Sequence, residues 1–211
     1  RLGQYFYWID QRKEVQQFVH SCVQCASNKS SNQAPAGLLQ PLEIPQRRWE
    51  HVSLDFIGPL PVTLHNRYDM ILTVVDKFSK MVHLLPCNSS ITAAQTAHLF
   101  FNGVVKYHGI PSAIISDRDP RFTSKFWKEL WKLMGTQLKM STAYHPQSNG
   151  QTERTNRTVE EILRSMVNTN ANDWDQHRAA GEIACNSSKQ SSTNHNPYEL
   201  NYGENIRLPL D

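Results

Sequence analysis

The chain has 211 residues, of which 39% are apolar, and this content is enough for one full-sized domain with a buried core plus a small appendage. Its formal net charge of +3 is compatible with a polyanionic partner, but a mild positive charge alone does not identify a nucleic-acid-binding protein. The sequence has no apolar run near the roughly 18 residues of a membrane span and no basic-then-apolar leader, which disfavours membrane and secreted proteins.

The first residues predict a small helical unit. Residues 1–29 have an aromatic-rich start, then apolar residues at helical spacing from Ile9 to Val19, and then the pair Cys22-Val-Gln-Cys25. Four cysteines with a single Cys-x-x-Cys favour a metal site in a reducing, intracellular compartment over a disulfide framework. Residues 30–48 lack periodicity and contain Pro, Gly and Ser, so we interpret them as a linker.

The remaining residues, 49–208, predict a larger domain. It begins with three strand-like runs separated by turn signals, which indicates an antiparallel meander, and helical and strand-like patterns then alternate. The predicted strands are Val52–Phe56, Met70–Val75, Met81–Leu85, Ala113–Ser116 and Gln137–Met140. The predicted helices run from an N-cap at Thr92 through Tyr107, from an N-cap at Thr123 through Met134, from about Gln151 to Asn168, and from the Asn172-Asp-Trp segment, before a surface loop at 187–196. This order predicts an α/β fold with a five-stranded mixed sheet and helices on both faces.

Three acidic residues stand where phosphoryl-transfer chemistry would need them. Asp55 lies among apolar residues in the first strand, Asp117 ends the fourth strand, and Glu153 is in the first turn of the long helix. Catalysis with two divalent ions needs several carboxylates from different elements, because the ions are about 3.5–4 Å apart and share ligands. The three acids therefore stand in the layout that a site for two divalent ions would need.

Spacing alone leaves a simpler interpretation open. The chain has 19 acidic residues, so some Asp, Asp, Glu triple is easily found by chance. Asp117 could cap a turn before Asp119-Pro120, and Glu153 could be an ordinary first-turn acid favoured by the helix dipole. We interpret the other acids near these motifs as structural or surface residues. They are Asp69, Asp76 and Asp119.

The surroundings of the three acids resemble a known family. The segments Leu54-Asp-Phe-Ile-Gly-Pro-Leu-Pro, Ile115-Ser-Asp-Arg-Asp-Pro-Arg-Phe and Tyr144-His-Pro-Gln-Ser-Asn-Gly-Gln-Thr-Glu-Arg are similar to the three acidic motifs of gypsy-type LTR retrotransposon integrases. The similarity continues through Trp174 and Ala184-Cys-Asn-Ser to Pro197-Tyr-Glu-Leu-Asn-Tyr-Gly. The resemblance implies a ribonuclease H-like catalytic core, an Asp55, Asp117, Glu153 triad that binds two Mg²⁺ or Mn²⁺ ions, and 3′-end processing followed by strand transfer.

The same resemblance implies contacts with DNA. The polar segment Ala143 to Gly150 is expected to close over DNA, although a plain connector has the same composition. The predicted DNA-binding residues are Arg118, His145, Asn149, Gln151, Asn156 and Arg157. Two alternatives stay open: Arg157 could instead form a salt bridge to Glu153 or Glu161, and Arg118 and Arg121 could only balance local charge.

The cysteine pair predicts an incomplete zinc site. Cys22 and Cys25 are half of the His2Cys2 set that the resemblance implies for the N-terminal domain, and structural zinc takes four protein ligands. In the resembling family two histidines lie a few dozen residues upstream, but this chain has no histidine before His20. We expect the parent protein to bind Zn²⁺ here and this chain to bind it weakly or not at all. Cys87 and Cys185 are interpreted as packed or surface thiols.

The resemblance also implies partners and a location. We expect double-stranded DNA as the substrate, a homo-oligomer as the active form, a longer Pol polyprotein as the parent, and the nucleus as the compartment. Two alternatives remain: a domesticated or decayed core that binds DNA or protein without catalysis, and a ribonuclease H-type nuclease or cut-and-paste transposase.

Overall fold

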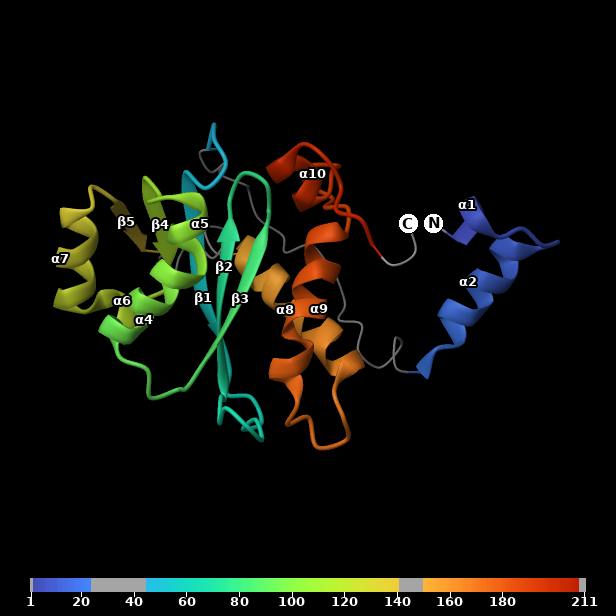
Figure 1. Cartoon of the computed structure of the whole chain (residues 1–211), viewed down its shortest axis with the longest axis horizontal. Coiled ribbons are helices and arrows are strands. Elements are labelled where there is room, and N and C mark those ends of the chain that lie inside the picture. Colours follow the sequence, from blue (N-terminus) through green and yellow to red (C-terminus); the bar gives the residue numbers. More distant parts are fainter. Residues whose placement is uncertain (1, 24–44, 141–149, 209–211) are drawn as a thin grey trace, which may run out of the picture. The chain divides into compact units, whose positions relative to one another are not determined.

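The computed structural model describes residues 2–23, 45–140 and 150–208 (Figure 1). The chain separates into two compact units, Arg1–Leu38 and Leu39–Asp211. In the described ranges, no helix is both long and apolar enough to cross a membrane.

The first unit contains two short helices, α1 (Leu2–Tyr5) and α2 (Gln11–Ser21). The helix predicted from the apolar spacing is confirmed as α2, but none of its side chains is buried. A hydrogen bond of 2.7 Å from Trp8 Nε1 to Glu14 Oε2 links the preceding turn to the helix. Cys22 follows α2 directly, whereas Cys25 lies outside the described residues.

The second unit is built on a five-stranded mixed sheet with the strand order β3-β2-β1-β4-β5. The first three strands pair antiparallel, and β1, β4 and β5 pair parallel, which confirms the predicted meander and the predicted mixed sheet. The strands are β1 (His51–Ile57), β2 (Met70–Asp76), β3 (Val82–Cys87), β4 (Ala113–Ser116) and β5 (Gln137–Met140).

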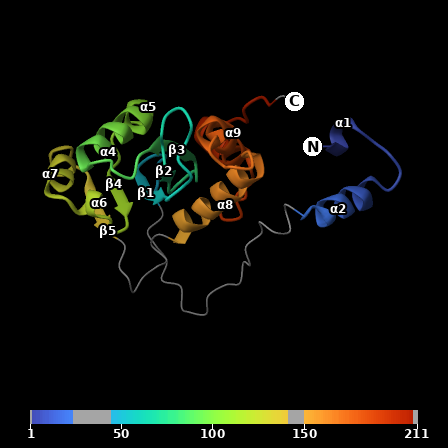
Figure 2. The same cartoon turned by 90° about the horizontal axis from the view of Figure 1, so that it is seen from below.

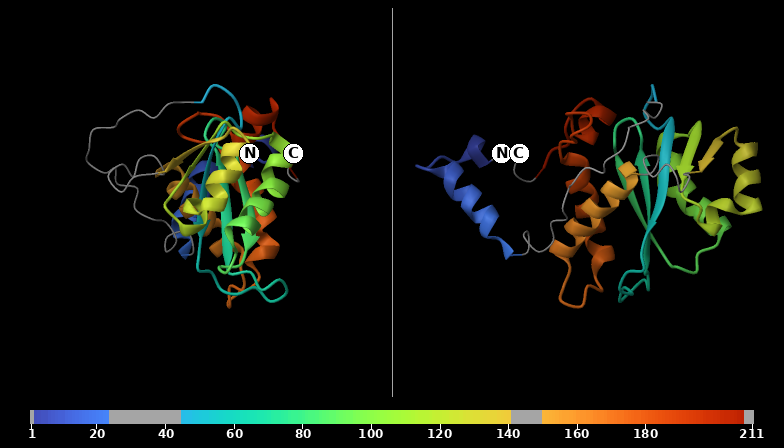
Figure 3. Two further views of the ribbon diagram at one scale, coloured as in Figure 1. Left: turned by 90° about the vertical axis from the view of Figure 1, so that its left-hand side faces the viewer. Right: turned by 180° about the vertical axis from the view of Figure 1, so that it is seen from behind.

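Helices cover both faces of this sheet (Figures 1 and 2). Alternate residues of one strand enter two separate cores, because successive side chains point to opposite faces. Leu72 and Val74 of β2 pack into one core, and Ile71 and Val75 pack into the other. The first core includes buried residues of the helices between β3 and β5, and the second includes buried residues of α8 and α9. These two groups of helices lie on opposite sides of the sheet in Figure 3 as well.

The first helix after the meander begins as predicted at Thr92, which forms a capping box with Gln95. It continues as α4 (Ala93–Phe100), a π-helical turn η1 (Phe101–Val105) and α5 (Lys106–His108). The π turn contains Gly103, and a Cβ at this position would lie 2.5 Å from Leu85 Cδ2. Glycine at this position therefore leaves room for the Leu85 side chain of β3.

The predicted N-cap at Thr123 is wrong. A short helix, α6 (Pro120–Thr123), begins earlier because Asp119 accepts a hydrogen bond from the Arg121 N–H and Pro120 occupies the first helical turn. Ser124 then caps the next helix, α7 (Lys125–Leu133). Thr123 ends α6, and its hydroxyl donates back to the carbonyls of Asp119 and Pro120.

The final helices are α8 (Gly150–Met166), α9 (Trp174–Ser187) and α10 (Pro197–Tyr202). The first two were predicted from the apolar pattern. The third was not predicted as a helix, although it has a recognisable start: the Asn196 side chain accepts from the Glu199 N–H, and Pro197 follows the cap.

Candidate active site

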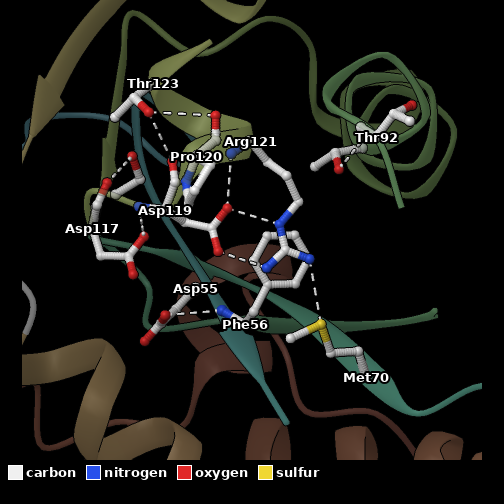
Figure 4. A network of polar contacts seen from close by, with 11 residues as sticks. Asp55, Phe56, Met70, Thr92, Asp117, Asp119, Pro120, Arg121 and Thr123 are labelled. Atoms are coloured by element: carbon white, nitrogen blue, oxygen red, sulfur yellow. Dashed lines mark hydrogen bonds and ion pairs between the residues drawn. The ribbon is translucent and has the colours of Figure 1, made fainter. Parts of the chain in front are cut away.

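The candidate site lies where the ladder between β1 and β4 ends. These strands pair parallel, and the last pair in their ladder is Leu54 with Ser116. Asp55 and Asp117 are the next residues on each strand, so the ladder itself brings them to the same edge. Figure 4 shows both carboxylates facing the same side of the sheet. Neither acid caps a helix, but the Asp117 Oδ1 accepts a hydrogen bond of 3.0 Å from the Asp119 N–H.

The third acid comes from α8, which is attached to β1 by two hydrogen bonds between side chains. The Thr152 hydroxyl donates to Ser53 Oγ over 2.6 Å in a buried contact. One turn later, Asn156 Nδ2 donates to Asp55 Oδ2 over 2.9 Å. Ser53 and Asp55 are two residues apart on β1, and their partners Thr152 and Asn156 are four apart on α8. One face of α8 therefore lies along β1. Glu153 directly follows the buried Thr152 and is itself exposed.

Burial and mutual repulsion raise the pKa of Asp55 to about 6. Desolvation is the largest cause, and the negative charges of Asp117 and Glu153 add to it. The hydrogen bonds from Phe56 N–H and Asn156 act in the opposite direction. The pKa of Asp117 is also raised, chiefly by burial. The folded chain therefore holds acids close together at a cost in electrostatic free energy that a cation would remove.

The residues at this edge suit a hard divalent cation. Carboxylate oxygens are the ligands that Mg²⁺ and Mn²⁺ prefer. Beside them, the Oδ1 atom of Asn156 is buried and has no hydrogen-bond partner in the described structure. A buried acceptor next to repelling carboxylates is satisfied by a cation or by the water that a cation carries.

The three carboxylates are not gathered into one metal site in the described structure. Within the described ranges, no three His, Cys, Asp or Glu side chains are already arranged to hold a metal ion. Asp55 and Asp117 are partly buried, whereas Glu153 is exposed. Glu153 is therefore the carboxylate that must turn toward the other two.

A partly buried ion pair lies close to the two aspartates. The Arg121 guanidinium donates to both carboxylate oxygens of Asp119, over 2.7 and 2.6 Å. It also lies over the Phe56 ring, with 3.7 Å from Cζ to the ring centroid. The sequence analysis assigned Asp119 a structural or surface role and left Arg121 open as local charge balance. The short Asp-Pro-Arg spacing was the available signal for this pair.

The predicted DNA-binding residues fall into three groups. Arg118 and Arg157 are exposed. Asn156 is 9% exposed and contacts Asp55, so a phosphate contact by this residue stays a prediction. Gln151 belongs to α8, but its side chain is outside the described structure, as are all atoms of His145 and Asn149.

The sequence analysis also singled out Asp76 and three cysteines of the described ranges. Asp76 is fully buried and accepts hydrogen bonds from the Trp49 N–H, which precedes β1, and from the Ser79 N–H in the turn between β2 and β3, which fits its predicted structural role. Cys87 and Cys185 are buried, as predicted for packed thiols, and burial raises the pKa of each. Cys22 is partly buried in the other unit.

Sequence comparison relates the chain to known integrase proteins. Residues 45–146 match the family described as integrase core domain. Two polyproteins of Schizosaccharomyces pombe, the Transposon Tf2-3 and Tf2-4 polyproteins, are each 43% identical to the chain over 195 residues. The alignment covers 92% of this chain but 14% of each polyprotein, so the chain corresponds to a small part of these relatives.

Solved structures with low sequence identity share the fold. The simian T-cell lymphotropic virus intasome, in complex with PP2A regulatory subunit B56 gamma, gives a TM-score of 0.61 at 20% identity, over 93% of this chain and 68% of that chain. The HTLV-2 integrase catalytic core domain in complex with magnesium gives 0.57 at 17% identity, over 74% and 97%. These matches confirm the ribonuclease H-like fold that the sequence resemblance implied.

Proposed function

Because the chain is homologous to the Tf2 polyproteins and belongs with the integrase cores of Ty3/gypsy-type retrotransposons, we propose that it is a metal-dependent polynucleotidyl transferase. It would trim the 3′ ends of element DNA and then join them to target DNA. The observation that carries this proposal is that Asp55 of β1 and Asp117 after β4 lie side by side with raised pKa values, and that the charge of Glu153 on α8 contributes to the raised pKa of Asp55.

In this proposal the three carboxylates hold two Mg²⁺ or Mn²⁺ ions. When bound, such ions activate the attacking oxygen and stabilise the leaving oxygen of an in-line displacement. In strand transfer the 3′ oxygen of element DNA forms a new bond to a target phosphorus, and the bond from that phosphorus to the target's 3′ oxygen breaks. The proton of the attacking hydroxyl passes to solvent, and no covalent link to the protein forms.

The other residues of the site would keep the carboxylates ionised and in place. Asn156 donates to Asp55 Oδ2, which favours the charged form of that acid. The buried contact between Thr152 and Ser53 fixes the first turn of α8 on β1. Glu153 follows that anchor directly, so its backbone is held while its side chain stays free to turn.

Double-stranded DNA is the proposed substrate, with element ends and target DNA both bound. The exposed Arg118 follows Asp117 directly, and the exposed Arg157 lies one turn after Glu153, so both are placed for phosphates near the acids. His145, Asn149 and Gln151 are proposed contacts on sequence grounds alone.

The assembly and the location are proposals as well. The active form would be a homo-oligomer, because two DNA ends must be joined together, and the structural relative above is an intasome. The chain would be released from a longer Pol polyprotein, as its similarity to 14% of the Tf2 polyproteins suggests. Its task places it in the nucleus. Cys22 and Cys25 would bind Zn²⁺ only together with two further ligands.

A strand-transfer assay tests this function. The chain, restored to full integrase length, is incubated with a labelled, pre-trimmed element end and plasmid in Mn²⁺ or Mg²⁺. We compare it with an Asp117→Asn, Glu153→Gln double variant and with Glu160→Gln, which removes a partly exposed acid, paired with Arg164, from the same helix. Joined products from the parent and the control, but not from the double variant, would support the proposal.

Other outcomes identify the alternatives. Retained DNA binding without joining by any of the three proteins would indicate a decayed or domesticated core. Cleavage of RNA–DNA hybrids without joining would indicate a ribonuclease H-type nuclease. Excision of the element end from flanking DNA would indicate a cut-and-paste transposase.

A further inference from the structure

We propose that Arg121 is a positioning residue that fixes the separation of Asp55 and Asp117, rather than a contact to DNA. This inference rests on the proposed function of the two acids as metal ligands. The device consists of Arg121, Asp119 and the Phe56 ring, and we call these three side chains the clamp. Phe56 directly follows Asp55, and the backbone N–H of Asp119 donates to Asp117. Arg121 contacts both Phe56 and Asp119.

A clamp is needed because the β1–β4 ladder stops just before the acids. Leu54 and Ser116 are the last pair that the two strands share. Asp55 is still held on its other side by pairing with Thr73 of β2. Asp117 has left the sheet, so no backbone ladder fixes its distance from Asp55. Side-chain contacts outside the ladder must therefore fix the distance between Asp55 and Asp117.

The ion pair fixes the Asp117 side of this gap. Arg121 donates to Asp119 through Nε and Nη2, and the Asp119 Oδ1 also accepts the Arg121 backbone N–H over 2.8 Å. The side chains of Arg121 and Asp119 are only 15% and 17% exposed. Asp119 in turn orients Asp117, because its backbone N–H donates to Asp117 Oδ1. A bidentate ion pair fixes the relative orientation of its two side chains as well as the distance between them.

The stacking contact fixes the Asp55 side. The Arg121 guanidinium lies over the ring of Phe56, whose backbone N–H donates to Asp55 Oδ1 over 2.9 Å. Phe122, the next residue after Arg121, stacks on the same ring with 5.2 Å between centroids. The Arg121 Nη1 also lies 3.4 Å from Met70 Sδ on β2. Figure 4 shows the guanidinium between the Asp119 carboxylate and the Phe56 ring.

These contacts occupy the guanidinium. Its charge is neutralised by Asp119, its face is covered by Phe56, and the side chain is largely buried. Arg118, three residues earlier, is exposed and has the opposite character. The motif Asp117-Arg-Asp-Pro-Arg thus contains one arginine directed to solvent and one directed into the protein.

The experiment measures metal affinity, so that it does not depend on DNA joining. Mn²⁺ binding to the full chain is followed by the loss of the free-ion signal in electron paramagnetic resonance. Arg121→Lys keeps the charge but loses both the planar fork and the stack. Phe56→Leu removes the stack and no charge. We expect each to weaken Mn²⁺ binding about tenfold, the usual effect of removing a residue that orients metal ligands, with an unfolding transition that remains cooperative.

Arg118→Gln is the matched control. It should leave Mn²⁺ affinity within about twofold of the parent and weaken metal-free DNA binding, with a lower salt dependence. The proposal is overturned if Arg121→Lys and Phe56→Leu both fold and bind Mn²⁺ like the parent. It is also overturned if Arg121→Lys lowers metal-free DNA affinity as Arg118→Gln does and leaves Mn²⁺ binding intact.

The failure of the proposed function has a different signature. A parent chain that binds Mn²⁺ through Asp117 and Glu153 but joins no DNA would refute integrase activity while leaving the clamp testable. A double-mutant cycle gives a further check on positioning. Asp119→Asn and Arg121→Gln remove the same interaction, so the double variant should weaken Mn²⁺ binding by less than the product of the two single effects.

Discussion

Replacing Asp55 with asparagine should stabilise the metal-free protein although it removes a proposed metal ligand. Burial and the neighbouring acids raise the pKa of Asp55 from 3.8 to about 6. Since one pKa unit corresponds to about 1.4 kcal/mol, keeping this carboxylate ionised at pH 7.5 costs the folded state at most about 3 kcal/mol. Partial exposure lowers that cost, and asparagine accepts fewer hydrogen bonds, so we expect a gain of about 1–2 kcal/mol.

The gain has a defined pH dependence. An acid whose pKa is raised on folding binds more protons in the folded state than in the unfolded state between those two pKa values. The penalty on wild-type Asp55 is therefore complete above about pH 6, and it disappears as the pH falls toward 3.8. The advantage of Asp55→Asn should follow the same course and be absent near pH 3.8.

Urea unfolding in EDTA at several pH values measures this difference, with Glu160→Gln as the control for removing one partly exposed acid. Adding Mn²⁺ at about 100 times its Kd should stabilise the wild type by about 2.7 kcal/mol and Asp55→Asn by much less. An Asp55→Asn protein that is no more stable than wild type at pH 7.5 would refute the reasoning. So would an advantage that persists unchanged at pH 4.

Three further changes test the fold around the site. The His108 pKa is lowered from 6.5 to about 4 by burial and by His83, so the stability it contributes is present above pH 6.5 and is lost as the pH falls toward 4; His108→Phe should remove about 1–3 kcal/mol of that acid loss in urea unfolding. Gly103→Ala places a Cβ 2.5 Å from Leu85 Cδ2 and should lower the unfolding free energy by about 1 kcal/mol or more. Asp76→Ala removes the buried acceptor of the Trp49 and Ser79 N–H groups and should lower the melting temperature, with a cost of about 3 kcal/mol or more.

His108 lies in a cluster with His83 and Trp49. His83 Nδ1 lies 2.7 Å from Glu182 Oε1, and His83 Nε2 lies 2.9 Å from His108 Nε2. His108 also stacks on Trp49 with 3.7 Å between centroids, which phenylalanine can preserve. A wild type and a His108→Phe variant that lose stability in parallel between pH 6.5 and 4 would contradict the assigned pKa.

Much of the sheet could be predicted because strand signals are local. Both faces of β2 enter cores, so the strand is a nearly continuous apolar run, and such a short run between turn signals is visible in the sequence without any tertiary information. The adjacency of Asp55 and Asp117 follows from the parallel pairing of β1 with β4, whose last pair comes directly before these two residues. The short helix α6 was not predicted, and the cap of α7 was placed at Thr123 instead of Ser124, because Asp119, Thr123 and Ser124 are all good capping residues and sequence alone does not rank them. Pro120 decides the matter, since its fixed φ favours the first helical turn.

The contacts that were missed depend on docking rather than on local pattern. Asn156 and Asp55 are 101 residues apart, and their hydrogen bond exists only because α8 lies along β1. A polar residue one turn after Glu153 is equally well placed to contact a phosphate. The sequence therefore did not predict that Asn156 donates to Asp55. Arg121 illustrates the same ambiguity at short range: its partner Asp119 is two residues away, but the Phe56 ring that covers it comes from another strand.

These contacts also determine which part of the site moves when a cation binds. Asp55 is held by Phe56 N–H and Asn156, and Asp117 by Asp119 N–H, so both aspartates are fixed before any ligand arrives. The backbone of Glu153 is fixed too, because the buried Thr152 anchors the residue before it. The side chain of the exposed Glu153 is thus the part of the proposed triad without such a contact in the described structure, and ordering it costs up to about 2 kcal/mol of rotamer freedom. That cost is of the same order as the repulsion and desolvation that a cation would relieve at Asp55, so closure would depend on the cation.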